Sequence, residues 1–444
     1  MIFFLTGGRD MLLKFRVKNY RSIKQEAVLD LEAVGLNDQR ECLLKHKRKS
    51  YLPVISIYGK NGGGKSNLIR AFWLAVQFIR NAQRTQYESA EVPVRPFELD
   101  DISKKTPTEF HFEYISNDIK YWYGFSATKE KIVTEYLYAA PKGQKSEIFT
   151  REYQNFHFPS NKEKSMKELI KQAVATNQLF FAISCVMNYE PCIKAMQWFR
   201  KEIFFSRDYS DLGQNILSHR EDKELLQSII QIAKVADFCI SDMKFEINNT
   251  EISNLEELPE FVTEQQRQEI EKAIEQFRKS LSADAESSEG ILQFNELKAT
   301  SYHKGKDSQG NIQEYALPLS EESDGTIRLM SRAAAIQDTL KVGGVLIVDE
   351  IENRLHPLLV QYIIEKFQNQ SDGQRAQLIF TTHSTDIMNR GMLRRDQYYF
   401  VDKDNMTGES ELYSLADFSV RLEENIAKAY LLGKYGAVPY IDEE

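Results

Sequence analysis

Residues 53–66 read P-V-I-S-I-Y-G-K-N-G-G-G-K-S and combine a short apolar strand with a glycine-rich turn. After this turn, residues 67–82 carry apolar side chains at the spacing of an amphipathic helix. The last part of the quoted stretch, 59–66, matches the pattern G-x-x-x-x-G-K-[ST] without a mismatch and has the required strand before it and helix after it. The sequence therefore predicts a phosphate-binding loop in an α/β fold.

The residue types in this loop suit a bound nucleotide. Glycine lets the backbone wrap closely around phosphate groups, so that N–H groups point at them, and the following helix adds the positive end of its dipole. Lys65 is predicted to supply a point charge to the β- and γ-phosphates, and Ser66 to supply a hydroxyl ligand to Mg²⁺. The predicted nucleotide contacts are Gly59, Lys60, Asn61, Gly62, Gly63, Gly64, Lys65, Ser66 and Asn67.

A second pattern lies at residues 345–350, which read V-L-I-V-D-E. A buried strand that ends in two acids delivers them to the carboxyl edge of an α/β sheet, where ligands bind. Asp349 is predicted to hold Mg²⁺, directly or through water, and Glu350 to act as the general base that polarises the attacking water. Without the phosphate-binding loop, a solvated strand end would be the simpler interpretation.

The spacing of the two patterns decides the domain organisation. A length of 444 residues suggests about three domains in series. However, Asp349 follows Lys65 by 284 residues, which is far more than a nucleotide-binding core needs. We therefore expect one interrupted core: an N-terminal half at 1–163 with an antiparallel meander, a helical insert at 164–290, and a C-terminal half at 291–444.

The composition speaks against a membrane protein and against a basic nucleic-acid-binding surface over the whole chain. The net charge is −8, from 57 basic and 65 acidic residues, although a local basic patch that binds nucleic acid is compatible with it. No stretch of about 18 apolar residues occurs. None of the cysteines lies in a C-x-x-C pair, which favours reduced thiols in the cytoplasm. These cysteines are Cys42, Cys185, Cys192 and Cys239.

Three further segments indicate which branch of the phosphate-loop proteins this chain resembles. They are L-S-E-E-S-D-G-T-I-R-L at 319–329, E-N-R-L-H-P at 352–357 and T-T-H-S at 381–384. In this order and spacing the set resembles the ABC-type ATPases, and within them the AAA15-type branch, a relative of the SMC, RecF and OLD ATPases. N-Y-R-S-I at 19–23 and the tail at 421–439 are also similar to that branch, so the resemblance covers both predicted halves of the core.

The resemblance implies ATP as substrate, Mg²⁺ as cofactor and an assembly of at least two head-to-tail subunits that share two nucleotides. Ser323 and Gly325 would be signature residues that reach the γ-phosphate across the interface, on a helix whose N-terminus adds its dipole. His383 would be the switch histidine that contacts the γ-phosphate in its own subunit, with a purely structural strand-end histidine as the alternative. Arg21 would approach the nucleotide, with a plain surface arginine as the alternative.

Departures from the family pattern limit the range of functions that fit the sequence. The signature reads S-D-G-T instead of the S-G-G-Q of transporters, which argues against a transporter motor. The glutamine of the Q-loop is not assignable, and its segment would lie near 94–100. The segment 351–357 would be the D-loop, in which His356 is expected to cap or pack rather than to catalyse. Asp402 and Asp404 imitate a metal-binding D-x-D, but a turn after a strand is the better interpretation.

Together these features predict an ATPase whose ATP-driven head-to-tail assembly regulates a partner effector. The resemblance points to ATPase subunits of bacterial anti-phage defence systems, in which the effector is often a nuclease. Only 61 residues follow His383, too few for the TOPRIM nuclease of OLD-type proteins, so a nuclease would be a separate chain. The alternatives are a DNA-repair or chromosome-maintenance ATPase of the RecF or SMC type, and a nucleotide-gated scaffold that hydrolyses little. No membrane partner is expected.

Overall fold

The computed structural model describes residues 10–36, 38–81, 91–206, 212–236, 239–252, 271, 292–371, 373–420 and 424–439. The chain divides into two compact units. The first combines Met1–Ser210 with Arg332–Glu444, and the second is Asp211–Ser331. The expected limits are 163/164 and 290/291. The first limit lies later because several helices and one strand that follow residue 163 belong to the first unit, and the second lies later because the segment from 291 to 331 belongs to the second unit.

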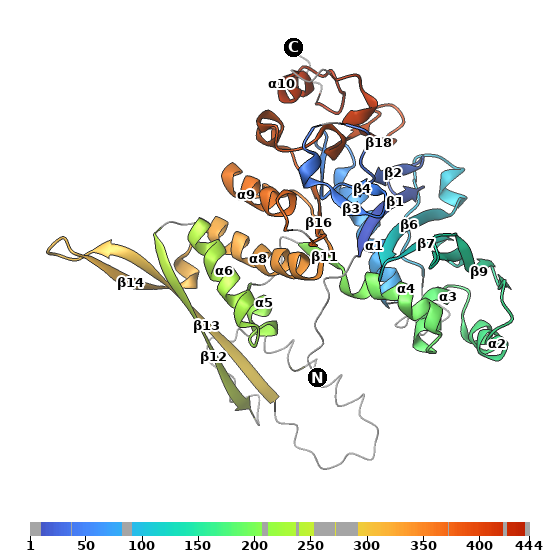
Figure 1. Ribbon diagram of the computed structural model, residues 1–444, viewed down its shortest axis with the longest axis horizontal. Helices are drawn as coiled ribbons and strands as arrows, with labels where there is room; N and C mark the ends of the chain where they lie inside the picture. Colours follow the sequence, from blue (N-terminus) through green and yellow to red (C-terminus); the bar gives the residue numbers. More distant parts are fainter. Residues whose placement is uncertain are drawn as a thin grey trace. The chain divides into compact units, whose positions relative to one another are not determined.

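The first unit contains the predicted α/β core, a six-stranded sheet with the order β11-β15-β16-β5-β17-β18. Figure 1 labels β11, β16 and β18 of this sheet. Neighbouring strands pair in parallel, except β17 and β18, which pair antiparallel. Because parallel strands share a direction, the loops that follow β15, β16 and β5 meet at one edge of the sheet. The strands are β11 (Ile203–Ser206), β15 (Val345–Val348), β16 (Gln377–Thr381), β5 (Val54–Tyr58), β17 (Tyr398–Lys403) and β18 (Ser410–Ser414).

The second sheet of this unit is antiparallel, has seven strands and has the order β10-β9-β8-β7-β6-β1-β2. The antiparallel subdomain predicted from the alternating sequence is therefore confirmed. A short hairpin of β3 (Leu44–His46) and β4 (Lys49–Tyr51) precedes β5. The seven strands are β1 (Met11–Lys18), β2 (Ala27–Asp30), β6 (Thr108–Ser116), β7 (Ile119–Ala127), β8 (Ile132–Ala140), β9 (Ser146–Glu152) and β10 (Asn155–His157).

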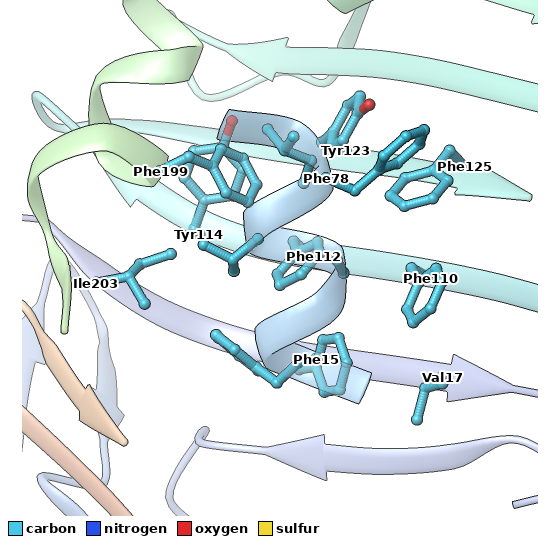
Figure 2. Packing of buried hydrophobic residues seen from close by; sticks show 14 of the residues in the cluster. Phe15, Val17, Phe78, Phe110, Phe112, Tyr114, Tyr123, Phe125, Phe199 and Ile203 are labelled. Atoms are coloured by element: carbon cyan, nitrogen blue, oxygen red, sulfur yellow. The ribbon is translucent and has the colours of Figure 1, made fainter. Parts of the chain in front are cut away.

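Helix α1 links the two sheets in one hydrophobic core. The ring of Phe72 lies 4.7 Å from that of Phe15 in β1, and the ring of Phe78 lies 5.8 Å from that of Phe125 in β7, centroid to centroid. Figure 2 shows α1 lying across the aromatic face of the antiparallel sheet. Ile57 near the end of β5 belongs to the same buried cluster, so the loop between β5 and α1 is held by packed elements on both sides. The helices of this unit are α1 (Lys65–Asn81), α2 (Lys164–Ala173), α3 (Phe180–Val186), α4 (Glu190–Lys201), α9 (Pro357–Gln368) and α10 (Ile426–Leu431).

The second unit combines helices with a three-stranded antiparallel sheet of order β12-β13-β14. The insert expected to be helical at 164–290 therefore also contains β12, whose residues 243–247 (M-K-F-E-I) alternate with the period of a strand. Within this insert the apolar spacing of residues 264–281 predicts a helix, and these residues fall outside the described ranges, apart from residue 271. The elements are α5 (Leu212–Ser218), α6 (Lys223–Ala236), β12 (Ile240–Ile252), β13 (Leu292–Lys306) and β14 (Ile312–Pro318), and α8 (Asp324–Val342) begins in this unit and continues into the first.

The four cysteines are free thiols. Burial raises the pKa of Cys42 to about 11 and that of Cys185 to about 12, so both thiols stay protonated at neutral pH. Across the ranges that the structure describes, no helix has both the length and the apolar character needed to cross a membrane.

A buried carboxylate fixes α3 on the antiparallel sheet. Glu135 of β8 is 1% exposed and accepts hydrogen bonds from Phe180 N–H at 2.8 Å and Phe181 N–H at 2.9 Å. It also accepts one from Tyr123 Oη at 3.0 Å and pairs with the buried Arg151 guanidinium at 3.3 Å. The carboxylate therefore satisfies two backbone donors at the start of α3 and compensates a buried positive charge.

Glu135→Ala is expected to destabilise the first unit by about 3–5 kcal/mol, because it leaves the Arg151 charge buried without its partner. Urea unfolding followed by tryptophan fluorescence measures the change. The matched control is Glu152→Ala on the neighbouring strand β9, where the side chain is exposed and the expected change is within about 0.5 kcal/mol. Equal stabilities of the two variants would show that the ion pair and cap contribute nothing specific.

Candidate functional site

The loop predicted at 59–66 lies between the end of β5 and the start of α1. At Gly59 a Cβ atom would lie 2.3 Å from the carbonyl oxygen of Val401, and at Gly64 a Cβ atom would lie 2.4 Å from Ser410 Oγ. Gly64 also has a φ of +114°, which L side chains rarely adopt. A side chain at either position would push the loop away from β17 and β18, so the tight wrap requires glycine.

The outer part of the loop lies at the surface, with Asn61 and Gly62 exposed, whereas Gly63 is buried. Lys60 Nζ pairs with Asp402 Oδ1 at 3.2 Å, which fixes the start of the loop to the end of β17. The carboxylate of Asp402 therefore has a structural role as the partner of Lys60.

Lys65, the first residue of α1, is 5% exposed. Its Nζ donates to the carbonyl oxygens of Gly59 at 2.8 Å and Lys60 at 3.3 Å, inside the curve of the loop. Burial lowers the pKa of Lys65, and the nearby carboxylates of Glu352, Asp349 and Glu350 oppose that shift. The ammonium group is therefore placed where the loop curves and is surrounded by acids.

Asp349 directly follows β15 and receives two hydroxyl hydrogen bonds on one oxygen. Thr381 Oγ1 donates to its Oδ1 at 2.6 Å, and Ser66 Oγ donates to the same atom at 3.3 Å. Ser66 and Asp349 are thus brought together from positions 283 residues apart. Hydroxyl and carboxylate oxygens are hard ligands that suit Mg²⁺, so this donor pair fits the predicted metal.

Glu350 is exposed and has a φ of +52°, in the left-handed region. Its backbone N–H donates to Thr381 Oγ1 at 2.7 Å, so the same hydroxyl group orders both acids of the pair. Arg332 of α8 donates to the carbonyl oxygens of Glu350 at 3.4 Å and Ile351 at 2.5 Å. A left-handed non-glycine residue costs about 1–2 kcal/mol, and these bonds on both sides hold it in place.

His383 lies beyond the end of β16, with its Nδ1 3.5 Å from Lys65 Nζ. An ammonium group only donates, so Nδ1 accepts and the imidazole proton is assigned to Nε2. Burial lowers the pKa of His383 below its ordinary value of 6.5, and the Lys65 charge lowers it further. The backbone N–H of His383 donates to Glu352 Oε1 at 2.5 Å. The histidine is therefore neutral at pH 7 and held against the loop.

Arg21 lies next to this site in a left-handed turn, with a φ of +50°. It lines a cavity of about 1120 Å³ together with Asn67 and Asp349. Its Nε is buried without a hydrogen-bond partner within the described residues. The adjacent Ser22 Oγ accepts from Asn67 Nδ2 at 2.8 Å and shares a hydrogen bond of 2.8 Å with Ser410 Oγ, so this turn contacts both α1 and β18.

The strand next to the acidic pair is β11, which was not predicted from the sequence. Ser206, at its end, pairs with Val348 directly before Asp349. Ser206 lines the same cavity as the segment 94–99, near which the Q-loop was expected. The end of β11 therefore adjoins the acidic pair on one side of β15, and the end of β16 adjoins it on the other.

Ser323 and Gly325 lie at the start of α8, in the second unit. Ser323 is exposed, its Oγ accepts from Thr326 N–H at 3.1 Å, and its carbonyl oxygen accepts from Ile327 N–H at 3.0 Å. Ser323 therefore caps this helix, as serine commonly does. The contact of both residues with a nucleotide of another subunit stays a prediction.

Two further sequence expectations are met. His356 Nδ1 accepts from Leu358 N–H at 3.2 Å, so His356 caps α9 as expected. Asp404 Oδ1 accepts from Met406 N–H at 2.9 Å and Thr407 N–H at 2.6 Å, which is the hydrogen-bond pattern of a turn. Within the described residues no group of three or more His, Cys, Asp or Glu side chains is arranged to hold a metal ion.

Three side chains that organise the site were not predicted from the sequence. Thr381 bridges the acidic pair, Glu352 holds the backbone of His383, and Ser22 connects the N-terminal turn to α1. All three stand inside segments quoted for other residues: T-T-H-S, E-N-R-L-H-P and N-Y-R-S-I. Polar residues within such segments are the signal that would have found them.

Solved structures of SMC head domains and of RecF match the chain at low similarity. An SMC head domain from Thermotoga maritima is 14% identical, with a TM-score of 0.36 over 91% of this chain and 98% of that chain. An SMC head bound to the C-winged helix domain of ScpA is 12% identical, with a TM-score of 0.40 over 93% and 98%. A RecF structure with ATP is 15% identical, with a TM-score of 0.36 over 93% and 100%.

At the level of sequence, no curated protein matches the chain. A family model does match, over residues 54–389, which is more than half of the chain and runs from β5 to the 3₁₀ turn after His383. The matched range contains the loop, the acidic pair and the histidine described above. The chain therefore belongs to the family described as "AAA domain, putative AbiEii toxin, Type IV TA system".

Proposed function

We propose that the chain is a cytoplasmic, Mg²⁺-dependent ATPase whose ATP-driven head-to-tail assembly regulates a partner effector in bacterial anti-phage defence. The observation that carries this proposal is the convergence of Lys65, the Ser66–Asp349 pair, Glu350 and His383 at one edge of the core sheet. A solvated strand end would not require a buried lysine, a shared hydroxyl and a neutral histidine around one loop.

On this proposal the loop holds the triphosphate of ATP. Backbone N–H groups of the loop and the start of α1 would bind the phosphates, and Lys65 would supply the fixed positive charge. Ser66 and Asp349 would hold Mg²⁺, which when bound neutralises phosphate charge. Lys65 is already buried inside the loop, so it needs no further desolvation when ATP binds.

Glu350 would accept a proton from the attacking water. Its exposed carboxylate stands at the sheet edge on a backbone that Thr381 and Arg332 fix. His383, neutral and with its proton on Nε2, would donate a hydrogen bond to the γ-phosphate without adding a charge that would compete with Lys65. The two residues follow neighbouring parallel strands, which supports their action on the same phosphate.

Assembly would complete the site. The exposed start of α8, with Ser323 and Gly325, would meet the γ-phosphate of a second subunit and add the positive end of its helix dipole. Two such contacts related by symmetry would enclose two ATP molecules between two chains. ATP binding would therefore favour the dimer, and hydrolysis would release it.

The family description calls the domain a putative toxin of a type IV TA system, which is compatible with a system of more than one component. The effector, such as a nuclease, would be a separate protein that the assembled ATPase holds or releases. Strong stimulation of ATP hydrolysis by DNA, lost at high salt, would instead favour the alternative of a DNA-repair or chromosome-maintenance ATPase.

Glu350→Gln is expected to bind ATP but to hydrolyse it about 10²–10⁴ times more slowly, because an amide does not accept the proton of water. ATP would then remain in the composite sites and trap the dimer. Phosphate release measures the hydrolysis, and light scattering after size exclusion measures the mass with and without Mg·ATP. Glu365→Gln on α9, where the side chain is exposed, is the control and should match wild type. An unchanged mass of Glu350→Gln on addition of ATP would refute the composite site.

The ATPase rate is expected to stay level from pH 8 down to 6.5 and to fall only in more acidic solution. His383 acts in its neutral form, and its lowered pKa keeps it neutral at and just below its ordinary value of 6.5. Protonation below that range removes the acceptor at Nδ1 and adds a charge beside Lys65. His383→Gln should be slower at every pH and should lack this acidic limb. An acidic limb centred above pH 6.5, or one that persists in the variant, would assign the titration to another group.

A further inference from the structure

The order of strands in the core sheet decides on which side of the loop the nucleoside of a bound nucleotide lies. The groups assigned to the γ-phosphate, Glu350 and His383, follow β15 and β16. Both strands lie on the same side of β5 in the order β11-β15-β16-β5-β17-β18. A triphosphate with its γ end on that side directs its nucleoside to the opposite side of β5, over β17 and β18. This step rests on the proposed function.

The loop contacts the ends of β17 and β18 closely on that side. The space where a Cβ atom of Gly59 would stand is occupied by the carbonyl oxygen of Val401, at 2.3 Å. Ser410 Oγ, at the start of β18, donates to the carbonyl oxygen of Gly63 at 2.7 Å. The turn 404–409 between the two strands is therefore the first surface that a nucleoside meets beyond the loop.

A cavity of about 720 Å³ lies at this turn. Its lining includes Lys60, Asn61 and Gly62 of the loop, so it is continuous with the predicted phosphate site. It also includes Leu99, which is 67% exposed, and Met406, which is 94% exposed. These two large apolar side chains, exposed beside the phosphate-binding loop, form a hydrophobic contact surface. Such a surface suits the flat apolar face of a nucleobase.

The walls of this cavity are held together by contacts outside the loop. Lys24 Nζ bridges Glu409 at 2.6 Å and Asp100 at 3.4 Å, which ties the turn to the segment that carries Leu99. Gly408 has a φ of +71°, and a Cβ atom there would lie 2.4 Å from Leu99 Cδ1. Leu99 can therefore pack against the turn because residue 408 is glycine.

We propose that this cavity binds the nucleoside of the triphosphate, with Leu99 and Met406 against the base. The apolar contact is made by exposed side chains, so nucleoside binding buries surface that is otherwise in water. Lys60 and Asn61 border the cavity where the triphosphate enters the loop. The turn 404–409, which lies 339 residues after Lys65, then decides which nucleotide the loop retains.

The test compares the binding of ATP with that of inorganic tripolyphosphate, which carries the same phosphate chain without a nucleoside. Wild-type protein should bind ATP at least tenfold more tightly. Leu99→Ser and Met406→Ser are each expected to weaken ATP about tenfold and to leave tripolyphosphate within twofold. Isothermal titration with Mg²⁺ present measures both probes on the full chain. Leu169→Ser on α2, where the side chain is 54% exposed, is the matched control and should change neither.

Each other outcome contradicts the proposal in a distinct way. An equal loss for both probes would mean that the variants disturb the loop. Unchanged ATP affinity in both variants would show that the nucleoside lies elsewhere. Wild-type protein that binds both probes equally would refute a nucleoside site while leaving the ATPase intact. Wild-type protein that binds neither probe would refute the proposed function itself, and the nucleoside site with it.

Discussion

The site depends on the hydrogen bonds of the Asp349 carboxylate. Through Thr381 and Ser66 this one group joins the ends of β15 and β16 to the first turn of α1. Thr381 Oγ1 also accepts a hydrogen bond from the backbone N–H of Glu350, so the acid proposed to bind Mg²⁺ and the proposed base share one hydroxyl. Loss of this hydroxyl would free both acids at once. The geometry of the site therefore depends on the order of the strands. The end of β15, the end of β16 and the first turn of α1 meet only when the parallel sheet is complete.

The long gap between the loop and the acids explains why two sheets are needed. Residues 108–201, which lie between them, build strands β6–β10 of the antiparallel sheet and helices α2–α4. The sheet packs on α1 through Phe72 and Phe78, and Figure 2 shows Phe78 against this sheet. Burial of such aromatic side chains contributes about 1.5–3 kcal/mol each. The antiparallel sheet therefore acts as a support that holds the phosphate-binding helix from the side opposite to the core sheet, rather than as a separate domain.

The sequence predicts the elements whose patterns lie in contiguous residues. It does not determine the contacts between residues that are far apart in the chain. The loop, the apolar strands of β5 and β15, and the meander carry their periodicity and their glycines in contiguous residues, and all are found as expected. β11 has only four residues, and the burial pattern of I-F-F-S depends on its parallel partner β15. Thr381 and Glu352 lie in segments that the sequence singles out, but their contacts with Asp349 and His383 depend on the folded structure. Ser206 near the acidic pair is likewise visible only once the strand order is known.

The balance of charge at the sheet edge gives a physical reason for both Mg²⁺ and assembly. Asp349, Glu350 and Glu352 all oppose the charge of Lys65, and His383 is neutral, so the lysine charge is partly compensated before a nucleotide enters. A triphosphate that enters such a site meets repulsion unless further positive charge arrives with it. Under the proposed function a divalent cation at Ser66 and Asp349 supplies part of that charge, and the helix start that carries Ser323 in a second subunit supplies more. On that proposal the single subunit would leave part of the negative charge of ATP unbalanced, and the dimer would balance it.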